Sequence, residues 1–162
     1  MEHIEVAIVG AGQAGLSVSH ELTAAGIDHV VLERDRIGEA WRRRWDSFCL
    51  VTPNWTVQLP GMPYDGTDPD GFMVRDEIVA HLERYARGFG APVREGVAVD
   101  AVETRPGGGF VLRTTSGELR ADALLLATGA FQRAHRPRGA ETLPDDILQI
   151  DAEDFRNEPS LP

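Results

Sequence analysis

The sequence predicts an α/β fold with a mostly parallel sheet, and three observations support this prediction. A β-branched run at residues 4–9 leads into a glycine-rich turn, a helical stretch and a second apolar run at residues 29–32. Residues 92–121 alternate again as short strands. Residues 123–127 form a continuous apolar run, the pattern of a fully buried parallel strand.

The glycine-rich turn reads Gly10-Ala11-Gly12-Gln13-Ala14-Gly15. In a strand–turn–helix unit, the first glycine allows a sharp turn, the second lets the backbone approach a pyrophosphate, and the third lets the helix pack on the strand. The free N–H groups at the start of the helix, with the dipole, would then face phosphates. The unit therefore predicts a Rossmann-like dinucleotide site, and a glycine-rich turn in an ordinary α/β domain is the alternative.

Glu33 stands 23 residues after Gly10, at the end of the second predicted strand. A carboxylate at this distance can accept both hydroxyls of an adenosine ribose, and it would repel a ribose 2′-phosphate. The first site is therefore expected to hold FAD or NAD rather than NADP.

Two helices are predicted, at residues 13–25 and 75–89. Gly26 ends the first, and Gly88 and Gly90 end the second. We expect His81, on the second helix, to face solvent. Residues 51–72, rich in Pro, Gly and Asp, are expected to form a long irregular loop. Asp68 and Asp70 mark a turn there, and no metal site is expected.

Five arginines gather within residues 34–44, among two tryptophans: Arg34, Arg36, Arg42, Arg43 and Arg44. One interpretation is a solvated basic face. The other is that one or two of these arginines neutralise phosphates or stack on a ring, while Trp41 and Trp45 form an apolar wall beside a planar cofactor.

Composition excludes several classes of function. The net charge of −10 argues against a nucleic-acid surface. All 16 basic residues are arginine, which excludes a Walker lysine and a Schiff-base lysine. Cys49 is the single cysteine, so no internal disulfide or thiol pair can form. No apolar run is long enough to span a bilayer, and the first strand begins too early for a leader peptide, so we expect a cytoplasmic protein.

Three strands are predicted between residues 97 and 121, joined by turns at Gly107-Gly108-Gly109 and at Ser116-Gly117. The family resemblance described next implies that these strands form a three-stranded antiparallel insert ahead of the parallel strand at residues 123–127. This run ends in Ala127-Thr128-Gly129, a tight turn.

The segment that follows Glu33 resembles the class B flavoprotein monooxygenases, which include the flavin-containing and Baeyer–Villiger monooxygenases. The residues that carry the resemblance are Gly38-Glu39-Ala40-Trp41, Arg44-Trp45-Asp46-Ser47, Leu50-Val51-Thr52-Pro53 and Leu59-Pro60-Gly61. The resemblance implies that Gly38 and Trp41 lie near the flavin ring, with Arg44 and residues 52–54 in the active-site region. Asn54 is the candidate for the functional asparagine of the animal enzymes, although Pro53 precedes it here.

The same resemblance extends to the second half of the chain. In these two-dinucleotide-domain flavoproteins, the strand leading into the antiparallel insert contacts adenine through its backbone, which implies this role for Val99. The Ala-Thr-Gly turn passes near the FAD phosphates and ring, which implies Thr128 and Gly129. The expected cofactor-binding set is completed by Gly10, Gly12, Gln13, Ala14, Gly15, Glu33, Arg34, Gly38 and Trp41.

The resemblance also implies an activity. Class B monooxygenases reduce FAD with NADPH held on a second glycine-rich domain, and molecular oxygen then forms a flavin hydroperoxide that oxidises a small molecule at nitrogen, sulfur or a ketone. Residues 1–162 carry no second such motif, so we expect an incomplete FAD-binding domain of a truncated, split or incomplete chain, inactive alone. The alternatives are a standalone FAD- or NAD-binding module and a related FAD-dependent reductase that works with a partner chain. The oligomeric state is left open.

Overall fold

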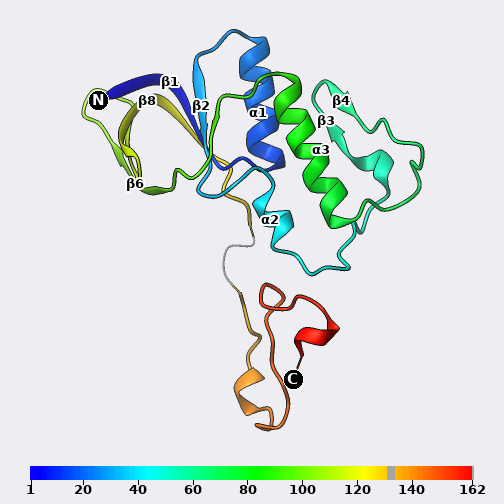
Figure 1. The fold of residues 1–162 in the computed structure, drawn as a ribbon. Helices are drawn as coiled ribbons and strands as arrows, with labels where there is room; N and C mark the ends of the chain where they lie inside the picture. The colour runs from blue at the N-terminus through cyan, green and yellow to red at the C-terminus, as the bar shows by residue number, and fades with distance from the viewer. Residues whose placement is uncertain (131–133, 162) are drawn as a thin grey trace.

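A computed structural model describes residues 1–130 and 134–161 and contains a six-stranded sheet with the order β5-β2-β1-β8-β7-β6 (Figure 1). The strands are β1 (Glu2–Val9), β2 (His29–Leu32), β5 (Val93–Arg94), β6 (Val99–Thr104), β7 (Phe110–Thr114) and β8 (Gly117–Leu126). The helices α1 (Gln13–Ala24), α2 (Glu39–Arg42) and α3 (Arg75–Gly88) lie to one side of this sheet. The predicted α/β fold is confirmed.

The parallel part of the sheet is β5-β2-β1-β8. Val9, the last residue of β1, pairs with Leu32 of β2 and with Leu126 of β8. Three strands therefore end side by side, at one edge of the sheet. In parallel α/β folds ligands bind at this carboxyl edge.

The antiparallel part is β8-β7-β6, so the predicted three-stranded insert is present. Its third strand is not separate from the last parallel strand, because β8 runs without interruption through both. Residues 117–121 pair with β7, while β1 pairs along β8 from Leu119 to Leu126. The insert is thus an extension of the main sheet.

Two apolar clusters stabilise the domain. One fills the space between the sheet and the helices, with Ile8, Leu16, Val31 and Leu82 buried in it. The other lies where the sheet curls on itself, and Ile4, Val30 and Leu112 belong to it. Each fully buried aliphatic side chain contributes about 1.5–3 kcal/mol to folding. The two clusters therefore hold in place the parallel strands whose carboxyl ends form this edge of the sheet.

The end of β8 is more exposed than the sequence predicts. Leu126 is 67% exposed, Ala123 is also exposed, and Leu124 and Leu125 are half-buried. Strand β7 pairs with β8 only as far as Ala121, and among the described residues no other strand pairs with the edge beyond it. The prediction of a parallel strand from this apolar run is confirmed. The prediction that the strand is fully buried is wrong.

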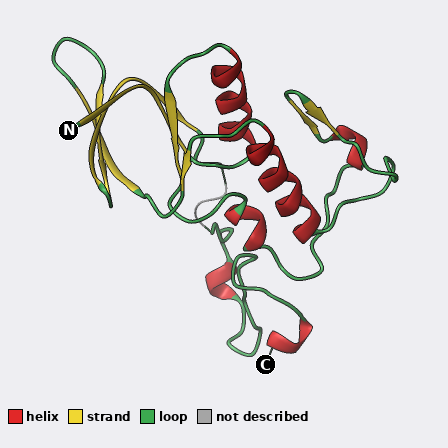
Figure 2. Cartoon of the chain, turned by 45° about the horizontal axis from the view of Figure 1, so that its top comes forward, coloured by secondary structure: helices red, strands yellow, loops and turns green. Residues whose placement is uncertain are grey.

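The expectation of a wholly irregular loop at residues 51–72 is also wrong in part. The segment contains a 3-10 helix (Asn54–Thr56) and a small hairpin of β3 (Gln58–Leu59) and β4 (Met62–Pro63). Figure 2 shows this hairpin on the far side of α3 from the sheet. Two further 3-10 helices, Ala140–Thr142 and Glu158–Ser160, belong to the C-terminal segment, which extends below α2.

His81 does not face solvent as predicted. It is 4% exposed, because α3 is covered on one side by α1 and the sheet and on the other by the segment that carries the hairpin. The amphipathic pattern of α3 identifies the face that packs on α1 and the sheet. It cannot show that the hairpin segment covers the opposite face, where His81 was expected to meet solvent.

Candidate functional site

A cleft of about 780 Å³ opens at the carboxyl edge of the parallel strands. The ends of β1 and β2, the turn after β8, the turn before α1, and α2 form its walls. Of the expected cofactor-binding residues, nine line this cleft: Gly10, Gly12, Glu33, Arg34, Gly38, Trp41, Val99, Thr128 and Gly129. Residues more than 110 positions apart in the sequence therefore meet around one space.

The protein's own packing requires glycine at positions 10 and 15. Gly10 has φ +106°, and a Cβ there would lie 2.5 Å from the carbonyl oxygen of Ala127. A Cβ on Gly15 would lie 1.9 Å from the carbonyl oxygen of Gly10. The sharp turn and the close helix packing predicted for these two glycines are both confirmed.

Gly12 is different, because a Cβ there would meet nothing within 4 Å. Its φ of −84° is open to any residue, so neither strain nor packing requires glycine. Gly12 lines the cleft and is the N-cap of α1. A side chain at this position would project into space that the protein itself does not fill.

The N-terminus of α1 lies at the cleft, because its N-cap residue Gly12 lines it. No side chain caps this helix, and its first turn contains no acidic residue. The first N–H groups of a helix carry partial positive charge and favour an anion. Gln13 and Ala14 begin α1, but their side chains are exposed and do not line the cleft. Their role in cofactor binding stays a prediction.

The Glu33 carboxylate lies against the glycine turn. Its Oε2 accepts the N–H of Ala11 at 2.8 Å, and its Oε1 accepts the N–H of Asp35 at 3.0 Å. Each carboxylate oxygen has two acceptor positions, so both retain capacity for a further donor. The two bonds hold the side chain at the cleft wall, where a pair of hydroxyl groups could reach it.

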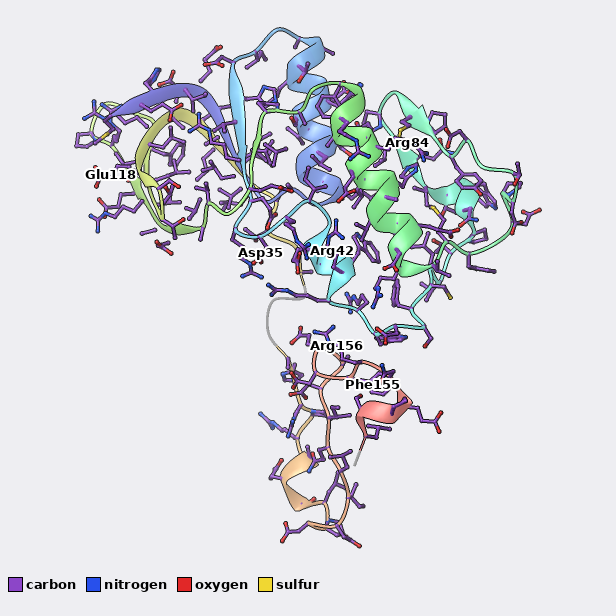
Figure 3. All side chains as sticks on the ribbon, viewed as in Figure 1. Asp35, Arg42, Arg84, Glu118, Phe155 and Arg156 are labelled. Atoms are coloured by element: carbon purple, nitrogen blue, oxygen red, sulfur yellow. The ribbon has the colours of Figure 1, made fainter. Side chains whose placement is uncertain are left out.

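The arginine cluster is an ion-pair network with nearby carboxylates. Arg43 lies 2.9 Å from Asp35 and 3.6 Å from Glu39, Arg34 lies 3.2 Å from Asp35, and Arg42 pairs with Glu83. Asp35 and Arg42 are labelled in Figure 3, at the end of β2 and on α2. Most of this cluster therefore fits the solvated-face interpretation, although Arg34, Arg43 and Arg44 also line the cleft.

Of the two tryptophans expected to form an apolar wall beside a cofactor, only Trp41 is at the cleft. Trp41 lines the cleft, as an apolar wall would. Trp45 instead packs on Phe48, with ring centroids 5.0 Å apart, and does not line the cleft. Trp41 also contacts Phe48, at 5.7 Å, so the two indoles flank one phenyl ring.

Sequence reasoning missed a C-terminal wall of the cleft at residues 152–156. The guanidinium of Arg156 donates to the carbonyl oxygen of Arg43 at 2.6 Å, and the carbonyl oxygen of Arg156 accepts the N–H of Asp46 at 2.8 Å. The Asn157 amide donates to Asp46 at 2.7 Å, and this bond, with a second from Arg75, holds the pKa of Asp46 below its usual value. No local pattern in the acidic C-terminal stretch signals a contact 110 residues away.

Asn54 is not at the cleft. It is 4% exposed, its Nδ2 donates to the carbonyl oxygen of Asp68 at 2.8 Å, and its Oδ1 accepts the N–H of Met73 at 2.6 Å. Both ends of the amide therefore hold the segment around the β3–β4 hairpin together. Asn54 therefore stabilises this segment and does not line the cleft.

The described residues contain no group of three or more His, Cys, Asp or Glu side chains suited to a metal ion. Over the same ranges, no helix has the length and apolar character to cross a bilayer.

The profile of the pyridine nucleotide-disulphide oxidoreductase family matches residues 7–156, which include the whole glycine turn, Glu33 and the Ala-Thr-Gly turn. The chain belongs to this family. The match spans the strands, helices and loops that build the cleft, so this family membership and the geometry of the site rest on the same residues.

Curated relatives include oxidoreductases and monooxygenases. An uncharacterized CzcO-like oxidoreductase of Geobacillus kaustophilus is 36% identical and covers 99% of this chain and 46% of its own length. Indole-3-pyruvate monooxygenase YUCCA1 of Oryza sativa is 36% identical over 75% of this chain and 31% of its own length. This family member thus spans less than half the length of these relatives, and the resemblance to flavoprotein monooxygenases is confirmed.

Solved structures agree on the fold. A flavin-containing monooxygenase from Stenotrophomonas maltophilia matches with a TM-score of 0.76 and 29% identity, over 85% of this chain and 42% of that one. An S-allyl-L-cysteine S-oxygenase from Allium sativum matches with a TM-score of 0.79 and 23% identity, over 95% and 43%. The second likeness establishes the shared fold alone.

Proposed function

We propose that this chain forms the FAD-binding part of a NAD(P)H-dependent flavoprotein monooxygenase that oxidises a small molecule. The observation that carries the proposal is Gly12, a cleft-lining N-cap glycine that nothing in the protein's own packing requires. A diphosphate held against the uncapped start of α1 would require it. The monooxygenase relatives supply the chemical class.

The cleft residues fit the adenosine diphosphate half of FAD. Glu33 offers two carboxylate oxygens for the ribose hydroxyls, Gly12 and the start of α1 offer a diphosphate site, and Val99 offers backbone groups beside the adenine. Bound FAD would supply the redox chemistry, while these residues bind and orient it. Gly38 and Trp41 on one wall and Thr128 and Gly129 on another would lie toward the flavin ring.

The nicotinamide cofactor, the substrate and molecular oxygen belong to the activity of the whole protein. We place NADPH on a second glycine-rich domain, outside residues 1–162, and expect the substrate to be oxidised at nitrogen, sulfur or a ketone. Residues 1–162 would then be an incomplete FAD-binding domain with weak affinity and no turnover alone. A cytoplasmic location is part of the same proposal and is testable by cell fractionation.

The second candidate is an FAD-dependent reductase that acts with a partner chain, which the family's name favours. Disulfide reduction by this chain alone is disfavoured, because a dithiol centre needs two cysteines and Cys49 is the single one. Cys49 is also exposed and lies outside the cleft lining. NADPH oxidation by the whole protein that is coupled to oxygen uptake would favour the monooxygenase.

Calorimetric titration of the purified chain tests the cofactor assignment. FAD and ADP should bind at one shared site, and FMN, which lacks the adenosine half, should bind at least about tenfold more weakly, the equivalent of one lost hydrogen bond to a charged group. NAD should bind better than NADP, because Glu33 would repel the 2′-phosphate. Equal affinity for FAD and FMN, or failure of ADP to compete with FAD, would show that the cleft is not the adenosine site.

A further inference from the structure

One wall of the cleft belongs neither to the sheet nor to the helices. It is formed by residues 152–156 of the C-terminal segment, residues 134–161, which extends away from the domain below α2 (Figure 1). Within it, Ala152, Glu153, Asp154 and Arg156 line the cleft. The shape of the space open to a ligand therefore depends on how this segment is held against the domain.

Arg156 and Asn157 join the C-terminal segment to the residues that follow α2. The guanidinium of Arg156 donates to the carbonyl oxygen of Arg43, and the carbonyl oxygen of Arg156 accepts the N–H of Asp46 at 2.8 Å. The Nδ2 of Asn157 donates to Oδ2 of Asp46 at 2.7 Å. Figure 3 shows Arg156 on the part of the segment that faces α2. Two of these three hydrogen bonds end on Asp46, one on its backbone and one on its side chain.

The other carboxylate oxygen of Asp46 is bonded to α3. Arg75, the first residue of this helix, donates from Nη1 to Oδ1 of Asp46 at 2.9 Å and to the carbonyl oxygen of Arg44 at 3.2 Å. Helix α3 is fixed in the domain by buried side chains, Ile78 and Leu82 among them. The Asp46 carboxylate therefore links a well-packed helix to the C-terminal segment.

The Asn157 amide has a fixed orientation, so it requires an acceptor at position 46. Its Oδ1 accepts the N–H of Ser160 at 3.1 Å, which directs Nδ2 toward Asp46. An amide side chain has one accepting end and one donating end, so it cannot turn around without losing the bond to Ser160. A carboxylate at position 46 meets the requirement and can serve Arg75 with its second oxygen.

We propose that Asp46 is a positioning residue for cofactor binding, which anchors residues 152–156 as a wall of the cleft and so controls how fast a bound nucleotide leaves. Asp46 does not line the cleft, so it acts through the wall. The contact consists of few hydrogen bonds between half-exposed groups, so it can open without unfolding of the domain. The inference rests on the proposed function, because it takes FAD as the ligand that this wall encloses.

Two single variants and their combination test the anchor. In D46N the new NH₂ group faces the NH₂ group of Asn157, and in N157D two carboxylates face each other. FAD dissociation, followed by flavin fluorescence during a chase with excess ADP, should be about three- to tenfold faster in each, the net value of one hydrogen bond. In D46N/N157D the donor and the acceptor are exchanged at unchanged net charge. Its rate should return to within about twofold of wild type.

A second measurement reads the wall without any ligand. The N–H of residue 46 donates to Arg156, so it should exchange faster with solvent in both single variants and recover its protection in the double variant. D76N is the matched control, because Asp76 pairs with the same Arg75, at 2.8 Å, and lies outside the cleft lining. Its FAD dissociation and its exchange at residue 46 should match wild type.

Three results would overturn the inference: wild-type FAD dissociation in both single variants, a double variant as fast as the single ones, or a D76N chain as fast as D46N. N157D keeps the test decisive if D46N does not fold, because Asn157 is exposed. Failure of the wild-type chain to bind FAD would contradict the proposed function. Amide exchange would then still decide whether Asp46 anchors the wall.

Discussion

Oε2 of Glu33 accepts the N–H of Ala11 across 2.8 Å, which joins the end of β2 to the glycine turn that follows β1. The same carboxylate accepts the N–H of Asp35 through its other oxygen. Both oxygens therefore accept hydrogen bonds from the chain itself. This arrangement makes Glu33 part of the shape of the cleft and also a proposed ligand to the ribose.

We expect E33Q to weaken ADP binding by about 1.5–3 kcal/mol, the range for a hydrogen bond to a charged group. In the amide an NH₂ group replaces one of the two oxygens, so either the Ala11 or the Asp35 N–H loses its acceptor, and the free energy of unfolding should fall by about 1–2 kcal/mol. Calorimetry and urea melts measure the two effects. E118Q is the control, because Glu118 lies on β8 away from the cleft, and unchanged ADP affinity in E33Q would remove Glu33 from the site.

The glycine turn offers a pair of substitutions with opposite effects. G12V should leave the free energy of unfolding within about 1 kcal/mol of the wild-type value, because a Cβ at this position meets no atom of the protein within 4 Å, yet it should abolish FAD and ADP binding. G15A should do the reverse and destabilise the fold by about 1–3 kcal/mol or more, because its Cβ would overlap the carbonyl oxygen of Gly10. A G12V chain that binds ADP like wild type would contradict the diphosphate assignment.

Stability should fall in mildly acidic solution because of His81. Burial and Arg84 lower its pKa in the folded chain, so between that pKa and the ordinary value of 6.5 the unfolded chain binds more protons. The contribution of the neutral imidazole is complete above pH 6.5 and is lost as the pH falls through the folded-state pKa. Urea melts from pH 7.5 to pH 5 should show a smaller decline for H81F than for wild type, and equal slopes would contradict the burial of a neutral imidazole.

Tyr85 is 3% exposed, and its hydroxyl has no hydrogen-bond partner among the described residues. Burial, with a smaller contribution from Glu21, raises its pKa to about 12. We expect Y85F to be neutral or to stabilise the chain by up to about 1 kcal/mol, since the unpaired hydroxyl is removed and the packed ring stays. A loss of more than about 1 kcal/mol in urea melts at pH 7 would mean that the hydroxyl has a partner.

The contact between the C-terminal segment and α2 can be followed at Asp46. In N157A the pKa of Asp46 should rise, because the Asn157 amide is the strongest influence that lowers it, with Arg75 next. The N–H of Asp46, which donates to Arg156, should exchange faster with solvent. Carboxyl NMR titration measures the first effect, and Asp76 is an internal control, because Arg75 lowers its pKa without Asn157.

The sequence predicted the parts of the site that follow from local rules. The turn between β1 and α1, the limits of β2 and the place of Glu33 depend on neighbouring residues, on glycine geometry and on the spacing of one βαβ unit. A parallel strand at residues 123–127 was also predicted from its apolar pattern, and the antiparallel strands before it from the family resemblance; the pairing of β8 with β1 appears only in the structure.

Other features depended on which distant segments cover a given surface. His81 is buried because the hairpin segment lies over α3, Asn54 is occupied by Asp68 and Met73, and residues 152–156 reach the cleft through Arg43 and Asp46. Periodicity describes how a segment divides its own faces, but it carries no information on what packs against the second face. The sequence alone therefore determined the βαβ unit and the class of ligand it suits. Tertiary structure decided the walls of the cleft and the burial of His81, because burial is a property of contacts between segments.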